Sequence, residues 1–186
     1  MITMYSQVKL KDVVRVPPSR FGEPLKEAIL SIVRETSAGI WDKDLGLVLS
    51  VIEVHEVGTG KIIPGDGAAY YDVEYEVLAY DPLVHEIIEG EVAEILEFGA
   101  FIRLGPVDGL VHVSQITNDF ISFDSKQRTL MAKESNRMLK EGDKVRARIV
   151  TVSKKKDGTK IGLTLRQPGL GKFEWIADDF KKEESA

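Results

Sequence analysis

The sequence predicts an α+β protein of two domains. Residues 1–82 are expected to form an antiparallel sheet with one main helix, and residues 83–186 an all-β, five-stranded barrel. An apolar stripe with helical spacing between residues 24 and 39, together with a segment that alternates apolar and acidic side chains, predicts the first domain. A succession of short β-rich segments separated by glycine-containing turns predicts the second.

The first domain is expected to begin with a valine-rich strand over residues 5–16. Pro17-Pro18 ends it, because neither proline can donate a hydrogen bond to a ladder. A helix follows with Pro24 near its first turn, where a missing N–H costs little. Its apolar side chains recur at i, i+3, i+4, i+7 and i+8, namely Leu25, Ala28, Ile29, Ile32 and Val33. We expect this helix to end at Gly39 and to bury one face on a sheet.

Two further strands are predicted over residues 47–57 and residues 69–80, separated by a loop with four glycines. The tip of this loop is apolar, with Ile62-Ile63-Pro64, and a solvated hairpin would not favour such a tip. Exposed apolar side chains on a loop are typical of a partner surface. The alternative is that the loop folds back onto its own sheet. A phosphate-binding loop is not supported, because no Gly-Lys-Ser/Thr ending or following helix is present.

The barrel is predicted from residue 85 onwards. Three strands are expected within residues 90–116, where Phe98 and Phe101 flank Gly99-Ala100, a small pair that would let a strand coil at a barrel corner. Strands over residues 144–152 and 161–166 complete the set, joined by a hairpin with Asp-Gly at its turn. Five strands with an inserted connection between the third and fourth describe an OB barrel.

Two segments of the second half are harder to place. Residues 117–140 are longer than a hairpin loop and contain one possible short strand over residues 119–124. Residues 167–186 read as a C-terminal extension in which Trp175 and Ile176 can pack back on the barrel. Residues 178–186 are charged enough that we expect them to fray.

Aromatic and basic side chains in the second half predict a single-stranded nucleic-acid surface. Phe98, Phe101 and His112 can stand on an open barrel face and stack on bases. Residues 140–166 add nine basic side chains against three acidic ones, and the candidates for phosphate contacts are Arg146, Arg148, Lys154, Lys155, Lys156 and Lys160. The alternatives are that the two phenylalanines are ordinary core and that the lysines guard a solvated strand edge.

Composition excludes several classes of protein and of functional site. Of the 186 residues 43% are apolar and 30% charged, as in soluble globular proteins, and no apolar run is long enough for a membrane span. The absence of cysteine excludes disulfides and fits a cytoplasmic protein. Three scattered histidines predict no metal cluster and no cofactor, and no motif sets a histidine beside a serine or carboxylate, so no catalytic site is expected.

Charge divides the chain. Residues 1–81 hold 8 Lys and Arg against 13 Asp and Glu, whereas residues 82–170 hold 14 against 12. An acidic first half beside a mildly basic second half suggests different partners for each half.

The second half resembles the RNA-binding OB fold of ribosomal protein S-one. The resemblance covers roughly residues 85–166 and rests on Gly90-x-Val-x-x-Ile-x-x-Phe-Gly-Ala-Phe101, Asp108-Gly-Leu-Val-His-Val-Ser114, Gly142-Asp143 and Ile161-x-Leu163. It implies an RNA-facing role for Phe98, Phe101 and His112. Ser153 and Lys160 stand where many family members carry an Asp and an Arg.

The whole chain resembles the E-prime family of archaeal RNA polymerase subunits, the counterpart of the seventh subunit of eukaryotic RNA polymerase II. The first half contributes Val13-Val-Arg-Val-Pro-Pro18, Asp44-Leu-Gly-Leu47 and Ile63-Pro-Gly-Asp-Gly67 to this resemblance. It implies a ribonucleoprotein-like N-terminal domain, a stalk formed as a heterodimer with the F subunit of RNA polymerase, docking on the RNA polymerase core near the clamp, and binding of nascent single-stranded RNA. The docking residues would be Lys61, Ile62, Ile63, Pro64, Gly65 and Asp66.

Two other functions remain open from the sequence. A free-standing translation or RNA-turnover factor could use the same barrel, although such proteins need not carry the apolar loop or the acidic first half. An RNA-processing nuclease would need clustered carboxylates for divalent metal ions.

Overall fold

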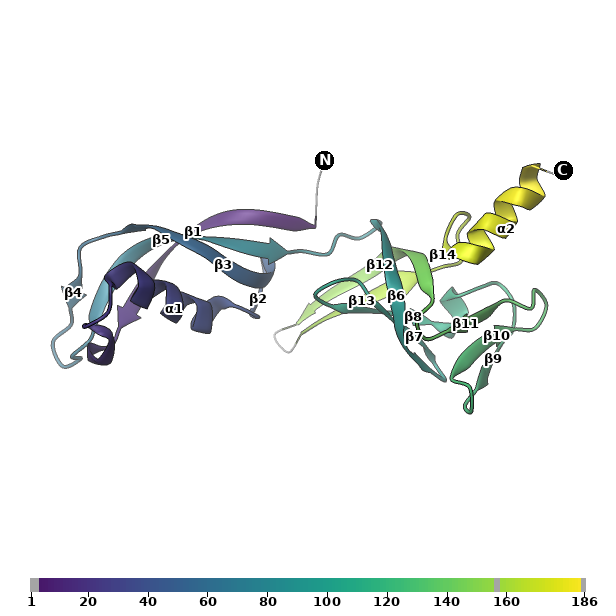
Figure 1. Ribbon diagram of the computed structural model, residues 1–186, viewed down its shortest axis with the longest axis horizontal. Helices are drawn as coiled ribbons and strands as arrows, with labels where there is room; N and C mark the ends of the chain where they lie inside the picture. Colours follow the sequence, from purple (N-terminus) through teal and green to yellow (C-terminus); the bar gives the residue numbers. More distant parts are fainter. Residues whose placement is uncertain (1–3, 156–157, 185–186) are drawn as a thin grey trace. The chain divides into compact units, whose positions relative to one another are not determined.

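The computed structural model describes residues 4–155 and 158–184. The chain divides into two compact units, residues 1–81 and residues 82–186, and Figure 1 traces the elements of each. Among the described residues, no helix is both long enough and apolar enough to cross a membrane.

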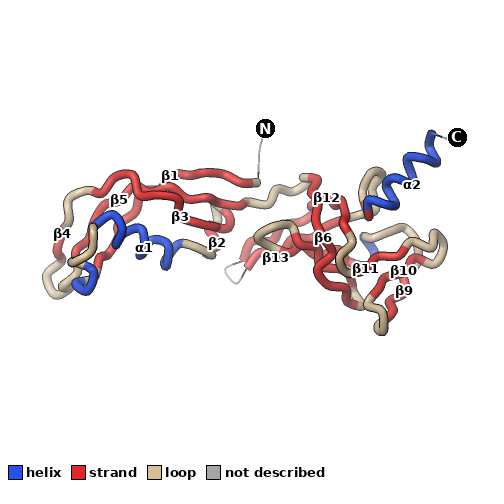
Figure 2. The backbone as a smooth tube through the Cα atoms, viewed as in Figure 1, coloured by secondary structure: helices blue, strands red, loops and turns tan. Residues whose placement is uncertain are grey.

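The first unit is an antiparallel sheet with one main helix, as predicted. Its strands are β1 (Tyr5–Val16), β2 (Trp41–Asp42), β3 (Gly46–Val57), β4 (Lys61–Ile62) and β5 (Ala69–Tyr80). They follow the order β1-β5-β3-β2, and β4 pairs with β5 (Figure 2). Helix α1 (Leu25–Ser37) buries Ala28, Ile29 and Val33 against this sheet, and the core contains valines from all three long strands.

The boundaries of α1 follow the expected signals. A short 3-10 helix, η1 (Pro18–Arg20), comes directly after β1, and α1 begins one residue after Pro24. Gly39 follows the helix with a φ of +80°, a conformation that glycine adopts without strain. Its N–H donates to the carbonyl of Val48 at 2.8 Å, which joins the end of the helix to β3.

The second unit contains the predicted five-stranded barrel. Strands β6 (Ile87–Leu96), β7 (Gly99–Arg103), β8 (Asp108–His112), β13 (Gly158–Thr164) and β12 (Lys144–Lys155) pair in that order, and β12 also pairs with β6, which closes the ring. The β8–β13 pair is parallel and the others are antiparallel. Alternate side chains point inward, so Val145, Ala147 and Ile149 of β12 are buried as predicted.

The inserted connection is more ordered than the sequence predicts. The possible strand over residues 119–124 is present as β9 (Ile121–Asp124), and β10 (Thr129–Ala132) and β11 (Met138–Lys140) join it in a separate three-stranded sheet. Leu130 lies opposite Leu139 on one side and Phe123 on the other. Strands of three and four residues give too little alternation to be recognised, and this sheet depends on tertiary burial of its leucines.

The expectation that residues 178–186 fray is wrong for the described part of that segment. After a two-residue strand, β14 (Gly171–Lys172), helix α2 runs over Phe173–Glu184. Lys172 sets its start, because its amino group lies 3.1 Å from the carboxylate of buried Asp143 and 2.8 Å from that of Glu174. Trp175 and Ile176 pack back as expected and are 8% and 7% exposed.

Candidate nucleic-acid interface and docking loop

The two phenylalanines come together at the β6–β7 hairpin. Phe98 occupies the turn and Phe101 lies on β7, with ring centroids 6.4 Å apart and planes at 88°. Phe98 is 48% exposed, so it is not an ordinary core residue. Gly99 opens β7 after a tight turn instead of bending the middle of a strand. A side chain there would meet the carbonyl oxygen of Val111 at 2.2 Å, so glycine is needed because β8 approaches closely.

A groove of about 580 Å³ runs along this face of the barrel. It brings together four of the predicted RNA-binding residues, Phe98, Phe101, His112 and Lys160. Ser153 also lines it and lies directly opposite Lys160 across the β12–β13 ladder. The two positions at which many S-one family members carry an Asp and an Arg are therefore neighbours at the same groove.

The ring of His112 is held from one side. Its Nδ1 accepts a hydrogen bond from the Ser114 N–H at 3.3 Å and lies 2.9 Å from the Ser114 Oγ. A neutral ring that accepts at Nδ1 carries its hydrogen on Nε2. No sequence motif sets a histidine beside a serine, yet the structure places these two in contact. The contact caps the short helix η2 (Val113–Gln115), which is a local structural role.

Arg146 and Arg148 do not line the groove. Arg146 donates through Nε and Nη2 to Glu89 Oε1 at 3.0 and 2.9 Å, and its guanidinium lies 5.5 Å from the Phe173 ring. Arg148 donates to the side chain of Gln167. Both arginines therefore connect the barrel to neighbouring segments.

The hairpin lysines are only partly described. Lys154 lies on β12 with an exposed side chain. The side chain of Lys155 and all of Lys156 fall outside the described residues. Of the basic residues predicted to contact phosphates, Lys160 is the one that lines the groove in the described part of the chain.

The apolar loop of the first unit is a defined turn. Asp66 N–H donates to the Ile63 carbonyl at 3.1 Å, with proline at the second position and Gly65 at the third with a φ of +92°. This is the pattern of a type II turn. The loop does pair with its own sheet, since Lys61 and Ile62 lie opposite residues of β5. Ile62 nevertheless stays 71% exposed and Ile63 49% exposed.

Asp66 ends this turn with a carboxylate that has four donors. Arg15 donates through Nε at 2.9 Å and Nη2 at 2.8 Å, the Tyr70 hydroxyl donates at 2.6 Å, and Ala68 N–H donates at 3.2 Å. The bonds from Arg15 and Tyr70 hold the pKa of Asp66 well below its usual range. The same bond to Asp66 raises the pKa of Tyr70.

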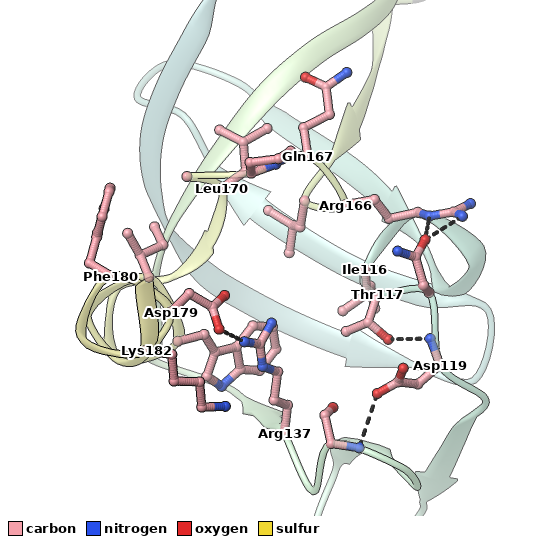
Figure 3. A pocket seen from close by; sticks show the side chains of 17 residues that line it. Ile116, Thr117, Asp119, Arg137, Arg166, Gln167, Leu170, Asp179, Phe180 and Lys182 are labelled. Atoms are coloured by element: carbon pink, nitrogen blue, oxygen red, sulfur yellow. Dashed lines mark hydrogen bonds and ion pairs between the residues drawn. The ribbon is translucent and has the colours of Figure 1, made fainter. Parts of the chain in front are cut away.

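The sequence did not predict a second cleft of about 660 Å³ beside α2. Figure 3 shows Arg137 directed at Asp179, with which it pairs. The Arg137 guanidinium also lies 5.6 Å from the Trp175 ring, and Arg166 Nε donates to Asn118 Oδ1 at 2.8 Å. Arg166 also donates to the Ser114 carbonyl at 3.1 Å. Trp175 was the available sequence signal for this region. Arg137 joins α2 to the inserted connection, and Arg166 joins the end of the barrel to the segment after β8, so both arginines hold together parts that are far apart in the chain.

One group among the described residues is close enough to hold a metal ion: Glu53, His55 and Glu76, whose candidate ligand atoms lie within 4.8 Å of one another. His55 Nδ1 lies 3.5 Å from Glu53, and Nε2 lies 3.0 Å from Glu76. The contact at Nε2 is a hydrogen bond, whereas the longer approach at Nδ1 is not one. The group is therefore described by a His55–Glu76 hydrogen bond beside a second carboxylate.

Two family models match the chain, one in each unit. Residues 11–67 match the SHS2 domain found in the N terminus of Rpb7p/Rpc25p/MJ0397, and residues 81–164 match the S1 RNA binding domain. The apolar loop falls in the first match and the groove in the second.

Close relatives cover nearly the whole chain. The DNA-directed RNA polymerase subunit Rpo7 of Saccharolobus shibatae is 43% identical over 175 residues, which is 93% of this chain and 97% of that protein. The chain belongs to the Rpo7 family. The Rpo7 of Saccharolobus solfataricus is 43% identical over 96% of this chain and 100% of its own, and that of Sulfolobus acidocaldarius is 42% identical over 96% and 98%.

Membership of the Rpo7 family makes this chain a subunit of a DNA-directed RNA polymerase with an S1-type OB domain. The archaeal relatives agree with the resemblance that the sequence indicated. The Rpo7 match covers 96% of the chain, whereas the S1 match ends at residue 164, before α2.

Proposed function

We propose that this chain is a stalk subunit without a catalytic site of its own. It pairs with the F subunit, docks on the polymerase core near the clamp, and binds nascent single-stranded RNA during transcription. The observation that carries the RNA part of the proposal is the groove itself. Phe98, Phe101, His112 and Lys160 line one surface although they come from three separate segments of the chain.

The groove supports RNA binding through two physical effects. Exposed aromatic rings accept any base by stacking, and this suits a transcript whose sequence changes from gene to gene. Lys160 at the groove, together with Lys154, Lys155 and Lys156 on the same hairpin, would attract the phosphates. Arg146 and Arg148 remain candidates only if their contacts with Glu89 and Gln167 open on binding.

Docking on the core is assigned to residues 61–66. Ile62 at the end of β4 and Ile63 at the start of the turn are large apolar side chains that stay exposed, and burial against a partner would recover the free energy that their exposure forfeits. The charge of the two halves agrees with this division, because the acidic first half is poorly suited to RNA.

The docking proposal is tested by replacing Ile62 and Ile63 together with aspartate. We expect affinity for core polymerase lacking this chain to fall about 100-fold or more, because two apolar contacts are lost and two charges are placed in the interface. Ile40→Asp is the matched control, since Ile40 is 53% exposed elsewhere in the same unit. Equal affinity of the double variant and the control would refute docking through this loop.

A further inference from the structure

The loop that presents Ile62 and Ile63 is tied to the sheet at both ends. Its entry is paired to β5 through Lys61 and Ile62. Its exit is Asp66, whose carboxylate receives two bonds from the Arg15 guanidinium and one from the Tyr70 hydroxyl. Between the two ends, the turn is closed by its own backbone bond from Asp66 to Ile63.

We refer to Arg15, Asp66 and Tyr70 as the clamp of this loop, a feature separate from the polymerase clamp. Strand register brings these three side chains together. Arg15 on β1 lies directly opposite Tyr70 on β5, and Tyr70 in turn lies opposite Lys61 on β4. Directly opposed residues of an antiparallel pair share a face of the sheet. Arg15 on β1 and Tyr70 on β5 therefore lie side by side on one face of the sheet, and both side chains contact Asp66 from there. Arg15 and Asp66 are nevertheless 51 residues apart in the chain.

The carboxylate of Asp66 is fully used. An ionised carboxylate offers about four acceptor positions, and Asp66 fills four with Arg15 Nε, Arg15 Nη2, Tyr70 Oη and Ala68 N. The two-point contact of a planar guanidinium also fixes orientation, which a lysine could not do. An exposed ion pair contributes little to the free energy of unfolding. The Arg15–Asp66 pair therefore matters chiefly for the shape of the loop.

We propose that Arg15 is a positioning residue for docking: through Asp66 it fixes residues 61–66 in the shape that the polymerase core binds. This inference rests on the proposed docking function. A loop held in its bound shape before contact loses less conformational entropy on binding, so the clamp raises affinity without itself touching the core. Tyr70 takes part through its hydroxyl.

The test compares variants of the full chain for affinity to core polymerase and for amide hydrogen exchange of residues 61–67. Arg15→Gln is expected to weaken binding about 5- to 10-fold and to speed amide exchange in the loop. Without the guanidinium the loop becomes more flexible, and it then loses more conformational entropy when it binds. Arg15→Lys and Tyr70→Phe should give intermediate values, because each keeps part of the clamp. Lys11→Gln is the matched control, since it removes an exposed ion pair with Glu74 from the same strand.

Three results would overturn the inference. Arg15→Gln could bind with the affinity of Lys11→Gln while the double aspartate variant at Ile62 and Ile63 fails to bind, which would leave docking intact and the clamp without a role. Arg15→Gln could lose affinity with unchanged loop exchange, which would make Arg15 a direct contact. Normal binding by both Arg15→Gln and the double variant would remove the docking function itself.

Discussion

At the level of single residues, the proposed RNA contact depends on side chains that line one groove of the barrel. Phe98 is half-exposed although its hairpin could have carried any polar turn residue. His112 is fixed by Ser114 at the edge of the same groove. Side chains that are both apolar and held in place lose little entropy when a base stacks on them.

Removing these rings should weaken RNA binding. Phe98→Ala, Phe101→Ala and His112→Ala are each expected to cost about 1–3 kcal/mol of binding free energy for single-stranded RNA for each base stack lost. Fluorescence anisotropy with a labelled oligonucleotide measures this on the chain mixed with the F subunit, its proposed partner. Phe120→Ala is the control, because Phe120 is 67% exposed and does not line the groove. If the variant with all three substitutions binds RNA with unchanged affinity, this face of the barrel does not bind RNA.

The clamp at Asp66 makes a prediction about pH. The pKa of the Asp66 carboxyl is lowered in the folded protein. The clamp is therefore fully formed above the ordinary carboxyl pKa of about 3.9, and it is lost only as pH falls through the lower pKa of Asp66 in the folded state. Carbon-detected NMR titration should therefore find Asp66 still ionised near pH 4. In Arg15→Gln the midpoint should move up toward the ordinary value. A wild-type midpoint at or above the ordinary value would contradict the clamp.

Single-residue inference from the sequence could go no further than placing side chains on one face of the barrel. Phe98, Phe101, His112 and Lys160 are predicted for one surface and do line one groove, although their contact with RNA stays a prediction. Arg146 could not be placed in advance. Its positive charge could pair either with an RNA phosphate or with the Glu89 carboxylate. Only the register of β12 against β6 shows that Glu89 lies close enough to Arg146 to pair with it.

At the level of elements, helix α2 shows how a terminal segment gains order from its contacts. Its sequence is rich in charge and predicts fraying, because an isolated helix of 12 residues is marginal in water. Trp175 changes this balance. It is buried, and the Arg137 guanidinium stacks 5.6 Å from its ring while pairing with Asp179. The contact joins segments far apart in the chain, so local sequence could not predict it.

Trp175→Ala should therefore destabilise the second unit. Loss of a buried tryptophan is expected to cost about 3 kcal/mol of unfolding free energy. Phe180→Ala, on the same helix at an exposed position, should stay within about 0.5 kcal/mol of wild type. Urea denaturation followed by far-UV circular dichroism separates the two. If both variants unfold at the same urea concentration, Trp175 does not anchor the helix.

The long elements were predictable, whereas of the three short strands in the inserted connection only β9 was expected, as a possible strand over residues 119–124. The segments for β1, β5 and α1 carry ten or more residues of clear periodicity, and their predicted spans agree closely with the structure. Strands β10 and β11 have four and three residues, too few for the alternation to exceed chance. Their order comes from burial of Leu130 and Leu139.

At the level of the whole molecule, the two units divide the proposed work. The first unit carries the acidic charge and the apolar loop, and its described residues form no aromatic groove of the kind that single strands need. The second carries the groove and most of the basic residues. A chain built this way can hold RNA with one unit while the other keeps it on the enzyme, and linkage of the two sites raises the effective concentration of each.

The proposal as a whole depends on whether the groove holds the transcript in the working enzyme. A photoreactive amino acid at Val150, which lines the groove, tests this in a reconstituted polymerase that is elongating a radiolabelled RNA. The same group at Phe120 provides the comparison, since Phe120 is exposed outside the groove. We expect crosslinks from Val150 to the transcript and few from Phe120. Transcript crosslinks that are absent at Val150, or equal at both positions, would show that the groove does not hold the RNA.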